Sequence, residues 1–301
     1  MIPATKLLPE DSQGLRPGHA GCPGCGHAIA MNLVLRSLGP RVAVVVVPSC
    51  AAVVSGPFPH TCLKVPAFHS AFEIAAPTAA GIAHALELQG DDRPVVAFAG
   101  DGGTFDIGLQ SLSGAADRNE NILYVCLDNE AYMNTGIQVS GSTPQFAWTG
   151  TTPSGNERRK KHIMEIMAAH RIPYAATASV GFAEDLIRKV QRAKETRGTR
   201  FIHLLSPCVT GWKIADHMAP KVAALAVETN VFPLYEIEDG VRYRLNFRPR
   251  PLPVEKYLSA QGRFRHLRAE QIAVVQAEAD RTWAELERRA ACAPVQTGFR
   301  G

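Results

Sequence analysis

Residues 95–108 read VVAFAGDGGTFDIG and join an apolar run directly to the glycine-rich segment 100–103, whose one carboxylate is Asp101. The run 95–99 has no charged residue, which is typical of a strand buried on both faces of a parallel sheet. Ligands of such sheets bind beyond the carboxyl ends of the strands. Glycines at that position let backbone N–H groups approach a phosphate, and the helix that follows favours the anion. This stretch therefore predicts an α/β sheet with a phosphate-binding strand end.

The same alternation of short apolar runs and longer helical patterns extends in both directions from this stretch. It predicts an α/β fold with a mostly parallel, doubly wound sheet that has helices on both faces. The expected strands are 42–47, 95–99, 122–127, 174–177 and 201–205, and the expected helices are 27–38, 72–88, 107–118, 160–170 and 183–194.

The chain is expected to divide near residue 210. Residues 1–210 carry the α/β pattern, and 211–301 form a C-terminal extension that we expect to pack on the same domain and on partner subunits. Within this extension a hairpin is indicated by the turn Glu238-Asp239-Gly240 between the short segments 234–237 and 241–245. The expected elements of the extension are helix 220–228, hairpin strands 234–237 and 241–245, and a polar helix 267–289.

Two expected strand ends carry oxygen ligands. Asp101 follows the strand 95–99, and the strand 122–127 ends in Asp128-Asn129-Glu130-Ala131. If the two strands are neighbours, Asp101 and Asn129 lie side by side, and oxygen ligands of this kind suit Mg²⁺ together with a diphosphate. The alternative is that Gly-Asp-Gly is only a tight turn and Asn129 a helix cap. A long loop at 136–156, rich in Gly, Ser and Thr, follows; such loops are often functional.

Four of the seven cysteines occupy positions that suit a metal site. Cys22 and Cys25 form a Cys-Pro-Gly-Cys motif, and Cys50 and Cys208 each follow an expected strand. From the motif alone, zinc, a redox dithiol and an iron–sulfur cluster remain open. An odd cysteine number in a large chain argues against a secreted disulfide framework. The other three are expected in the core (Cys126), in a loop (Cys62) and in the tail (Cys292).

The segments 100–108 and 128–136 together resemble the β subunit of pyruvate:ferredoxin oxidoreductase and its relatives, the thiamine diphosphate-binding subunits of 2-oxoacid:ferredoxin oxidoreductases. The resemblance covers the chain from about residue 18 to about residue 240. It implies thiamine diphosphate, Mg²⁺ and one [4Fe–4S] cluster as cofactors, with coenzyme A as co-substrate. In the family the cluster is held by a Cys-x-x-Cys pair, a later cysteine and a distant cysteine after proline, and Cys22, Cys25, Cys50 and Cys208 match this pattern.

The resemblance also implies roles for individual residues. Asp101, the side chain of Asn129 and the carbonyl group of Ala131 would coordinate Mg²⁺, and Asn134 would act as the catalytic residue near the substrate. His27 and His69 have ordinary alternatives, as a residue that starts a helix and as a loop histidine. The residues expected at the cofactor are His27, Ser49, Cys50, His69, Gly100, Asp101, Gly102, Gly103, Asn129, Ala131, Tyr132, Met133 and Asn134.

The implied activity is CoA-dependent oxidative decarboxylation of a 2-oxoacid to acyl-CoA and CO₂, with electrons passed one at a time to the cluster. Pyruvate is the default substrate; an aromatic 2-oxoacid such as phenylglyoxylate, a branched-chain 2-oxoacid or oxalate are alternatives. The glutamate that activates thiamine comes from another subunit in this family, and Glu73 reads equally well as a helix-start carboxylate. The resemblance thus implies α and γ-type subunits and a ferredoxin-like subunit or domain as partners.

Composition excludes several other classes of protein. The net charge of +4 and the absence of basic blocks give no reason to expect a nucleic-acid partner. The longest apolar run is far too short to span a membrane, and residues 1–10 lack a signal-peptide pattern, so we expect a cytoplasmic protein. Two alternatives from other classes are a cluster-free thiamine enzyme and a non-enzymatic metal-binding scaffold.

Overall fold

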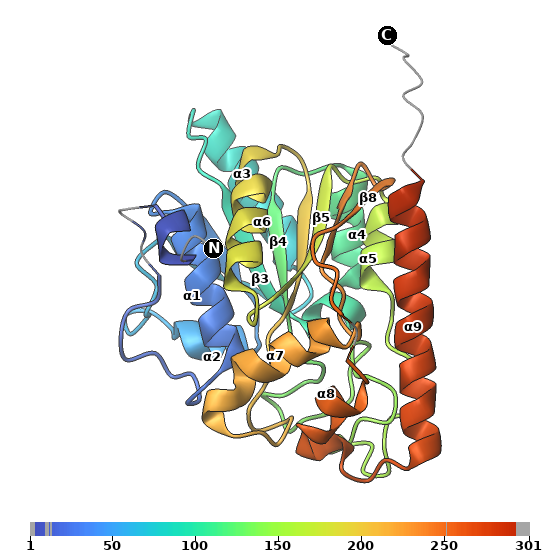
Figure 1. Cartoon of the computed structure of the whole chain (residues 1–301). Helices are drawn as coiled ribbons and strands as arrows, with labels where there is room; N and C mark the ends of the chain where they lie inside the picture. Colours follow the sequence, from blue (N-terminus) through green and yellow to red (C-terminus); the bar gives the residue numbers. More distant parts are fainter. Residues whose placement is uncertain (1–3, 10–11, 13, 251, 293–301) are drawn as a thin grey trace.

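One eight-stranded sheet runs through the computed structural model, which describes residues 4–9, 12, 14–250 and 252–292 (Figure 1). The strand order is β2-β1-β3-β4-β6-β5-β7-β8. The first six strands of this order are parallel, β7 pairs antiparallel with β5, and β8 pairs antiparallel with β7. The expected mostly parallel α/β sheet is therefore confirmed. The strands are β1 (Ala43–Val46), β2 (Ala67–His69), β3 (Val95–Gly100), β4 (Leu123–Asp128), β5 (Tyr174–Ser179), β6 (Arg200–Leu205), β7 (Tyr235–Glu238) and β8 (Arg242–Leu245).

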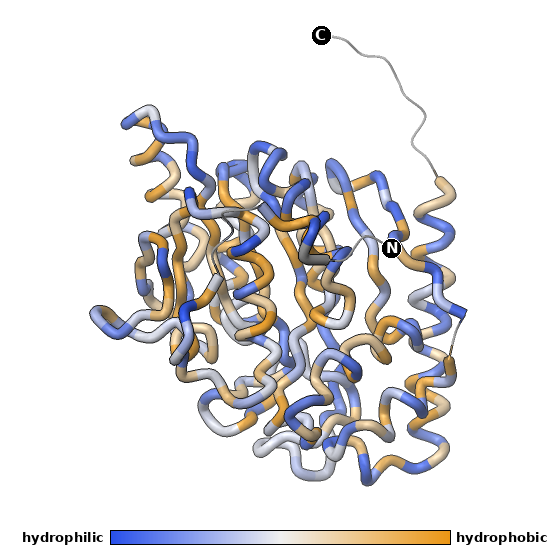
Figure 2. Tube along the Cα trace, turned by 60° about the vertical axis from the view of Figure 1, so that its left-hand side comes forward, coloured by the Kyte–Doolittle hydropathy of each residue, from blue (hydrophilic) through white to orange (hydrophobic). Residues whose placement is uncertain are grey.

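Helices cover both faces of this sheet. Since successive residues of a strand point to opposite sides, each buried strand contacts both layers of helices. Val44 and Val46 of β1 pack with α1, α2 and α6, whereas Ala43 and Val45 pack with α3, α4 and α5. Figure 2 shows the hydrophobic colouring gathered along the central strands. The helices of the two layers are α1 (Gly26–Leu38), α2 (Cys50–Ser55), α3 (Ala75–Leu88), α4 (Leu109–Asp117), α5 (Ile163–Ala169) and α6 (Ala183–Glu195).

The segment after residue 210 adds to this sheet and builds a third apolar cluster. The expected hairpin is confirmed, and its strand β7 pairs with β5, so the hairpin prolongs the main sheet. Trp212, Tyr257 and Phe264 centre the third cluster. No helix among the described residues is both long and apolar enough to cross a membrane. The helices here are α7 (Ala219–Glu228), α8 (Glu255–Ser259) and α9 (Ala269–Ala291), and the division at residue 210 stays a prediction.

Three local features differ from the sequence-based expectation. The strand β2 was not expected, since its three residues are exposed at the sheet edge and show no apolar pattern. The helix α2 begins at Cys50, where Ser49 caps it by accepting a hydrogen bond from the Ala51 N–H group. The helix expected at 107–118 starts only at Leu109, because a π-helical turn at Gly102–Asp106 precedes it.

The strand order changes direction at β1, and this switch point determines where the site lies. From β1 the chain continues to β2 on one side, and then returns to β3 on the other side of β1. In open α/β sheets, ligands bind in the crevice at such a switch point, beyond the carboxyl ends of the strands. Ser49 follows β1 there, Asp101 follows β3, and Asn129 follows β4. The fold thus brings the expected ligand residues to one end of the sheet.

Candidate functional site

Three oxygen atoms from β3 and β4 meet at this end of the sheet. The Asn129 side-chain oxygen lies 3.1 Å from Asp101 Oδ1 and 2.8 Å from the Ala131 carbonyl oxygen. None of the three atoms brings a proton to these contacts; only the opposite orientation of the amide would supply one. Octahedral Mg²⁺ at 2.0–2.1 Å from its ligands keeps neighbouring oxygens about 2.9 Å apart. The trio therefore fits a Mg²⁺ ion, and these residues are the ones expected from the sequence.

The residues around Asp101 differ in the space that they leave free. Asp101 is buried and accepts a hydrogen bond from the Ser140 hydroxyl group. Gly100 is buried, and an added Cβ there would meet the Ser49 Cβ at 3.6 Å, an ordinary van der Waals distance. Gly102 is different: an added Cβ would lie 2.2 Å from the Tyr132 ring. Gly100 thus leaves room for a ligand, whereas Gly102 makes room for a neighbouring side chain.

The carboxylate of Asp128, the last residue of β4, links the end of this strand to three other segments of the chain. It is fully buried and accepts hydrogen bonds from Ser142 Oγ at 2.6 Å, Lys160 Nζ at 2.7 Å and His203 Nε2 at 2.6 Å. Burial alone would raise its pKa, but Lys160 and His203 hold the pKa well below its usual value. Burial and the charge of Asp128 in turn raise the pKa of Asp101. A cation beside Asp101 would relieve this repulsion, which adds to the fit for Mg²⁺.

A second buried ion pair ties the C-terminal segment to the same loop. Glu130, at a φ of +67°, pairs with Arg263 at 2.5 Å and with Lys160 at 3.1 Å. Arg263 stacks 3.8 Å above the Trp212 ring, and Trp212 Nε1 donates to the Asn129 carbonyl oxygen at 2.8 Å. The residues on either side of Asn129 are therefore held by side chains that lie far away in the sequence.

Arg263→Met should lower the free energy of unfolding by about 3 kcal/mol, because it leaves the buried Glu130 carboxylate with Lys160 as its remaining cation. Chemical denaturation of the purified protein measures this. Arg242→Met is the matched control: Arg242 pairs with Glu238 at the surface, where an ion pair contributes about 0–1 kcal/mol. Equal losses for the two variants would contradict the role given to the buried pair.

Four cysteines from three segments gather next to the oxygen trio. The Gly26 N–H group donates to the Pro207 carbonyl oxygen at 3.1 Å, which docks the Cys22–Cys25 turn against Cys208. Cys50 starts α2, and its sulfur lies 4.0 Å from Asn129 Nδ2. All four thiols are free, and Cys22 is exposed. The structure therefore brings the predicted tetrad to the strand ends.

The surroundings of the four thiols indicate what kind of metal group they could hold. Burial, together with the nearby Cys208, Cys25, Asp101 and Cys22, raises the pKa of Cys50 to about 12. Metal ions would supply the missing positive charge. Tetrahedral zinc needs sulfur ligands about 3.8 Å apart. No three His, Cys, Asp or Glu side chains within the described ranges form a group that fits a single metal ion. The Gly211 N–H group donates to Cys208 Sγ at 3.3 Å, and hydrogen bonds of this kind to sulfur tune iron–sulfur clusters.

The remaining predicted residues fall into distinct places. His27 is buried behind Asn129, 3.4 Å from Asn129 Nδ2, and burial lowers its pKa to about 4. Tyr132 donates to Asp106, and Met133 packs against Gly211 beside Cys208. His69 and Asn134 are exposed, at the end of β2 and in the loop after β4. Contacts of these residues with a cofactor or substrate stay predictions.

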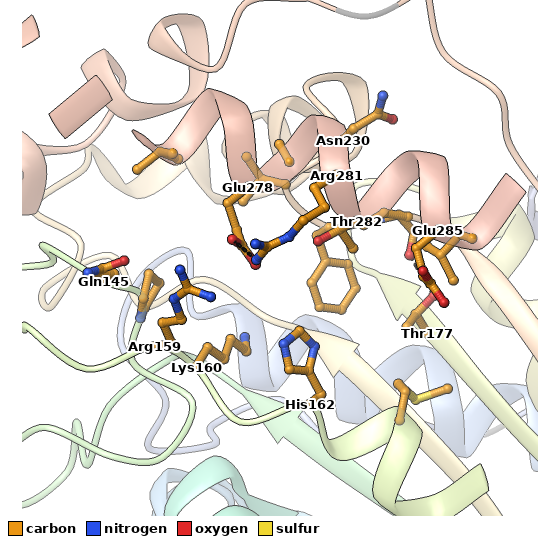
Figure 3. A pocket seen from close by; sticks show the side chains of 18 of the residues that line it. Gln145, Arg159, Lys160, His162, Thr177, Asn230, Glu278, Arg281, Thr282 and Glu285 are labelled. Atoms are coloured by element: carbon orange, nitrogen blue, oxygen red, sulfur yellow. Dashed lines mark hydrogen bonds and ion pairs between the residues drawn. The ribbon is translucent and has the colours of Figure 1, made fainter. Parts of the chain in front are cut away.

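A cavity of about 480 Å³ lies elsewhere, between α9 and the sheet (Figure 3). Arg159, Lys160 and His162 face it from one side, and Glu278 and Arg281 of α9 face it from the other. Of the described residues that line it, none belongs to the glycine segment 100–103 or to the cysteine tetrad. It meets the site through Lys160, Glu130 and His203, which line the cavity and take part in the contacts of Asp128 and Glu130.

Several residues that hold the site were not expected from the sequence. Ser140 and Ser142 lie in the long loop that composition marked as functional, so their region, but not their partners, was indicated. His203 is hidden within the largely apolar strand β6, Lys160 lies within the basic run 158–161, and Arg263 is one of three arginines in 263–268. Their contacts with Asp128 and Glu130 are visible only in the folded chain.

Three comparisons bear on this geometry. Residues 49–204 match the family described as thiamine pyrophosphate enzyme, C-terminal TPP binding domain, where thiamine pyrophosphate is thiamine diphosphate. The chain is 51% identical to pyruvate synthase subunit PorB of Methanothermobacter thermautotrophicus, over 93% of this chain and 99% of that protein. It is 43% identical to ketoisovalerate oxidoreductase subunit VorB of Pyrococcus abyssi, over 91% and 92%.

A solved structure is similar as well. It is the 2-oxoglutarate:ferredoxin oxidoreductase from Magnetococcus marinus with 2-oxoglutarate, coenzyme A and succinyl-CoA bound. The similarity has a TM-score of 0.58 and 26% sequence identity, and it covers 65% of this chain and 67% of that chain.

Proposed function

Since the chain belongs to the thiamine diphosphate-dependent 2-oxoacid:ferredoxin oxidoreductases, as a subunit of the PorB and VorB type, we propose that it holds thiamine diphosphate, Mg²⁺ and one [4Fe–4S] cluster side by side. The activity is that of an oxidoreductase that works as a multi-subunit complex. The proposal concerns which residues of this chain hold the cofactors, which 2-oxoacid is used and which partners complete the site.

One observation carries the proposal: Asn129 faces both groups. Its oxygen lies with Asp101 and Ala131 in the trio that fits Mg²⁺, and its nitrogen lies 4.0 Å from the sulfur of Cys50. A single side chain thus separates the expected diphosphate from the expected cluster. Electron transfer between a cofactor and a cluster requires them to be close, and neither a scaffold nor a cluster-free thiamine enzyme needs this arrangement.

The residues divide the work as follows. Asp101, Asn129 and Ala131 would hold Mg²⁺, and Gly100 would leave room for the diphosphate. Thiamine diphosphate supplies the carbanion chemistry that releases CO₂ from a 2-oxoacid. In the balanced reaction a 2-oxoacid anion and CoA–SH give acyl-CoA, CO₂, one proton and two electrons. Cys22, Cys25, Cys50 and Cys208 would hold the cluster that accepts these electrons singly.

Pyruvate is the proposed substrate. The support is the 51% identity to a pyruvate synthase subunit over nearly its whole length, against 43% to a ketoisovalerate oxidoreductase subunit. The branched-chain 2-oxoacid is therefore the second candidate. Asn134, exposed at the open side of the site, is the proposed substrate contact.

Partner subunits are proposed to cover the open side of the site. Phe68 in β2 and Ile107 directly after the π-helical turn are 54% and 47% exposed, and a partner subunit on this side would bury both apolar side chains. An α subunit there would bring the glutamate that activates thiamine, and γ-type and ferredoxin-like partners would complete the complex. We also keep the cytoplasm as the proposed location, because seven free cysteines suit a reducing compartment.

A substrate panel tests this proposal. The anaerobically purified complex is assayed with CoA, a viologen dye and, in turn, pyruvate, 2-oxoisovalerate, 2-oxoglutarate, phenylglyoxylate and oxalate. We expect the highest kcat/KM with pyruvate and no dye reduction without thiamine diphosphate. A higher kcat/KM for 2-oxoisovalerate would transfer the assignment to the branched-chain substrate. Dye reduction with none of the five would refute the proposed activity.

A further inference from the structure

His27 occupies an unusual position for a residue two places after a tetrad cysteine. It lies in the first turn of α1 and is only 2% exposed. Gly26 docks this turn on the β6 end, because an added Cβ there would lie 2.5 Å from the Pro207 carbonyl oxygen. The docking inserts the His27 ring between the ends of β4 and β6, where it contacts Asn129 and Ser206.

The hydrogen bonds of His27 have one consistent direction. Ser206 Oγ lies 3.3 Å from the Asp128 carbonyl oxygen, to which it donates its one proton. Ser206 Oγ therefore accepts from His27 Nδ1, 3.1 Å away, which places the proton of the neutral ring on Nδ1. The unprotonated Nε2 accepts, so the Asn129 atom that faces it at 3.4 Å must be the nitrogen, which donates. The chain of bonds thus ends on the backbone of β4.

This direction decides which way the Asn129 amide faces. With its nitrogen towards His27 and Cys50, its oxygen completes the trio with Asp101 and Ala131. In the opposite orientation the nitrogen would donate to Asp101 Oδ1 and to the Ala131 carbonyl oxygen, at 3.1 and 2.8 Å. It would then fill the cation position with a proton donor. The two orientations use the same space and differ in whether His27 accepts.

We propose that His27 is a positioning residue that keeps the Asn129 oxygen turned towards the metal position and the Asn129 nitrogen turned towards Cys50. This inference rests on the proposed function, because it concerns the Mg²⁺ of the thiamine diphosphate site. His27 acts through Asn129 and is not itself a ligand. Groups that orient a metal ligand in this way typically contribute a factor of about 10–100 to metal affinity.

The test measures the dissociation constant of Mg²⁺ in the assembled complex, at saturating thiamine diphosphate and after removal of metal with a chelator. His27→Phe keeps a ring but cannot accept a hydrogen bond, and we expect about 10–100-fold weaker Mg²⁺ binding. His27→Gln places an amide oxygen near the former Nε2 and should restore most of the affinity. His60→Phe, at an exposed histidine, is the matched control and should bind as the wild type.

Iron content separates positioning from damage to the fold. Wild-type Mg²⁺ affinity in a His27→Phe complex that retains its iron overturns the proposal. Equally weak Mg²⁺ binding by the Phe and Gln variants, with iron retained, overturns it as well.

If His27→Phe loses iron, Ser206→Ala is tested instead, since this change removes the hydrogen-bond partner of Nδ1 and leaves the ring in place. Weaker Mg²⁺ binding by Ser206→Ala then supports the proposal, and unchanged binding overturns it. A wild-type complex with no Mg²⁺-dependent thiamine binding would overturn the proposed function as well.

Discussion

Replacing Asp101 with alanine is expected to abolish the Mg²⁺-dependent retention of thiamine diphosphate, with a loss of affinity above about 100-fold, since even groups that only support a ligand contribute 10–100-fold. The variant removes the only carboxylate of the oxygen trio, and the amide and carbonyl oxygens that remain carry no formal charge. Thiamine retained per chain after gel filtration, with and without Mg²⁺, measures the effect.

The same variant should keep its fold. Asp101 and Asp128 are both buried, and the charge of Asp128 opposes ionisation of Asp101, so loss of one carboxylate removes repulsion. The melting temperature of the cofactor-free variant should therefore not fall below that of the cofactor-free wild type. Asp117→Ala, at an exposed carboxylate on α4, is the control that should retain thiamine. Unchanged retention by Asp101→Ala would favour the scaffold alternative.

Replacing any one of Cys22, Cys25, Cys50 or Cys208 with serine is the second change with a very large expected effect. A [4Fe–4S] cluster takes four thiolates, so each single replacement should remove most of the about four iron atoms per chain. The brown colour of this chain and electron transfer to the dye should be lost with the iron. Iron and sulfide analysis of the purified complex, by difference from the wild type, measures the loss.

Cysteines outside the tetrad provide the matched control. Cys292 is exposed after α9, and Cys292→Ser should leave the iron content unchanged. A loss of zinc rather than iron from the four tetrad variants would show that the site is structural. Loss of iron from Cys292→Ser would show that the ligand set differs from the one proposed here.

Most of the fold could be predicted from the sequence, because the central strands are buried on both faces and therefore read as plain apolar runs. The strand β3, followed at once by Gly100, is the clearest case, and the end of β4 marks Asn129 equally well. Sheet order is harder. The pairing of β7 with β5 joins residues about 60 positions apart, and local pattern shows a hairpin without showing where it docks.

Some residues of the candidate site could also be predicted from the sequence, and others could not. Asp101, Asn129 and the four cysteines stand at recognisable strand ends or in a Cys-x-x-Cys motif. The groups that hold them do not: Lys160, His203 and Arg263 reach Asp128 or Glu130 from three separate segments. The contact of His27 with the cofactor stays a prediction, whereas its contact with Asn129 is revealed only by the docking of α1 on the β6 end.

The central claim is that this chain holds a thiamine diphosphate site and an iron–sulfur cluster next to each other. The most direct test is the metal and thiamine content of the chain purified anaerobically with its α partner and without the ferredoxin-like subunit. We predict about four iron atoms and about one thiamine diphosphate per chain. Thiamine without iron, iron without thiamine, or zinc in place of iron would contradict the account.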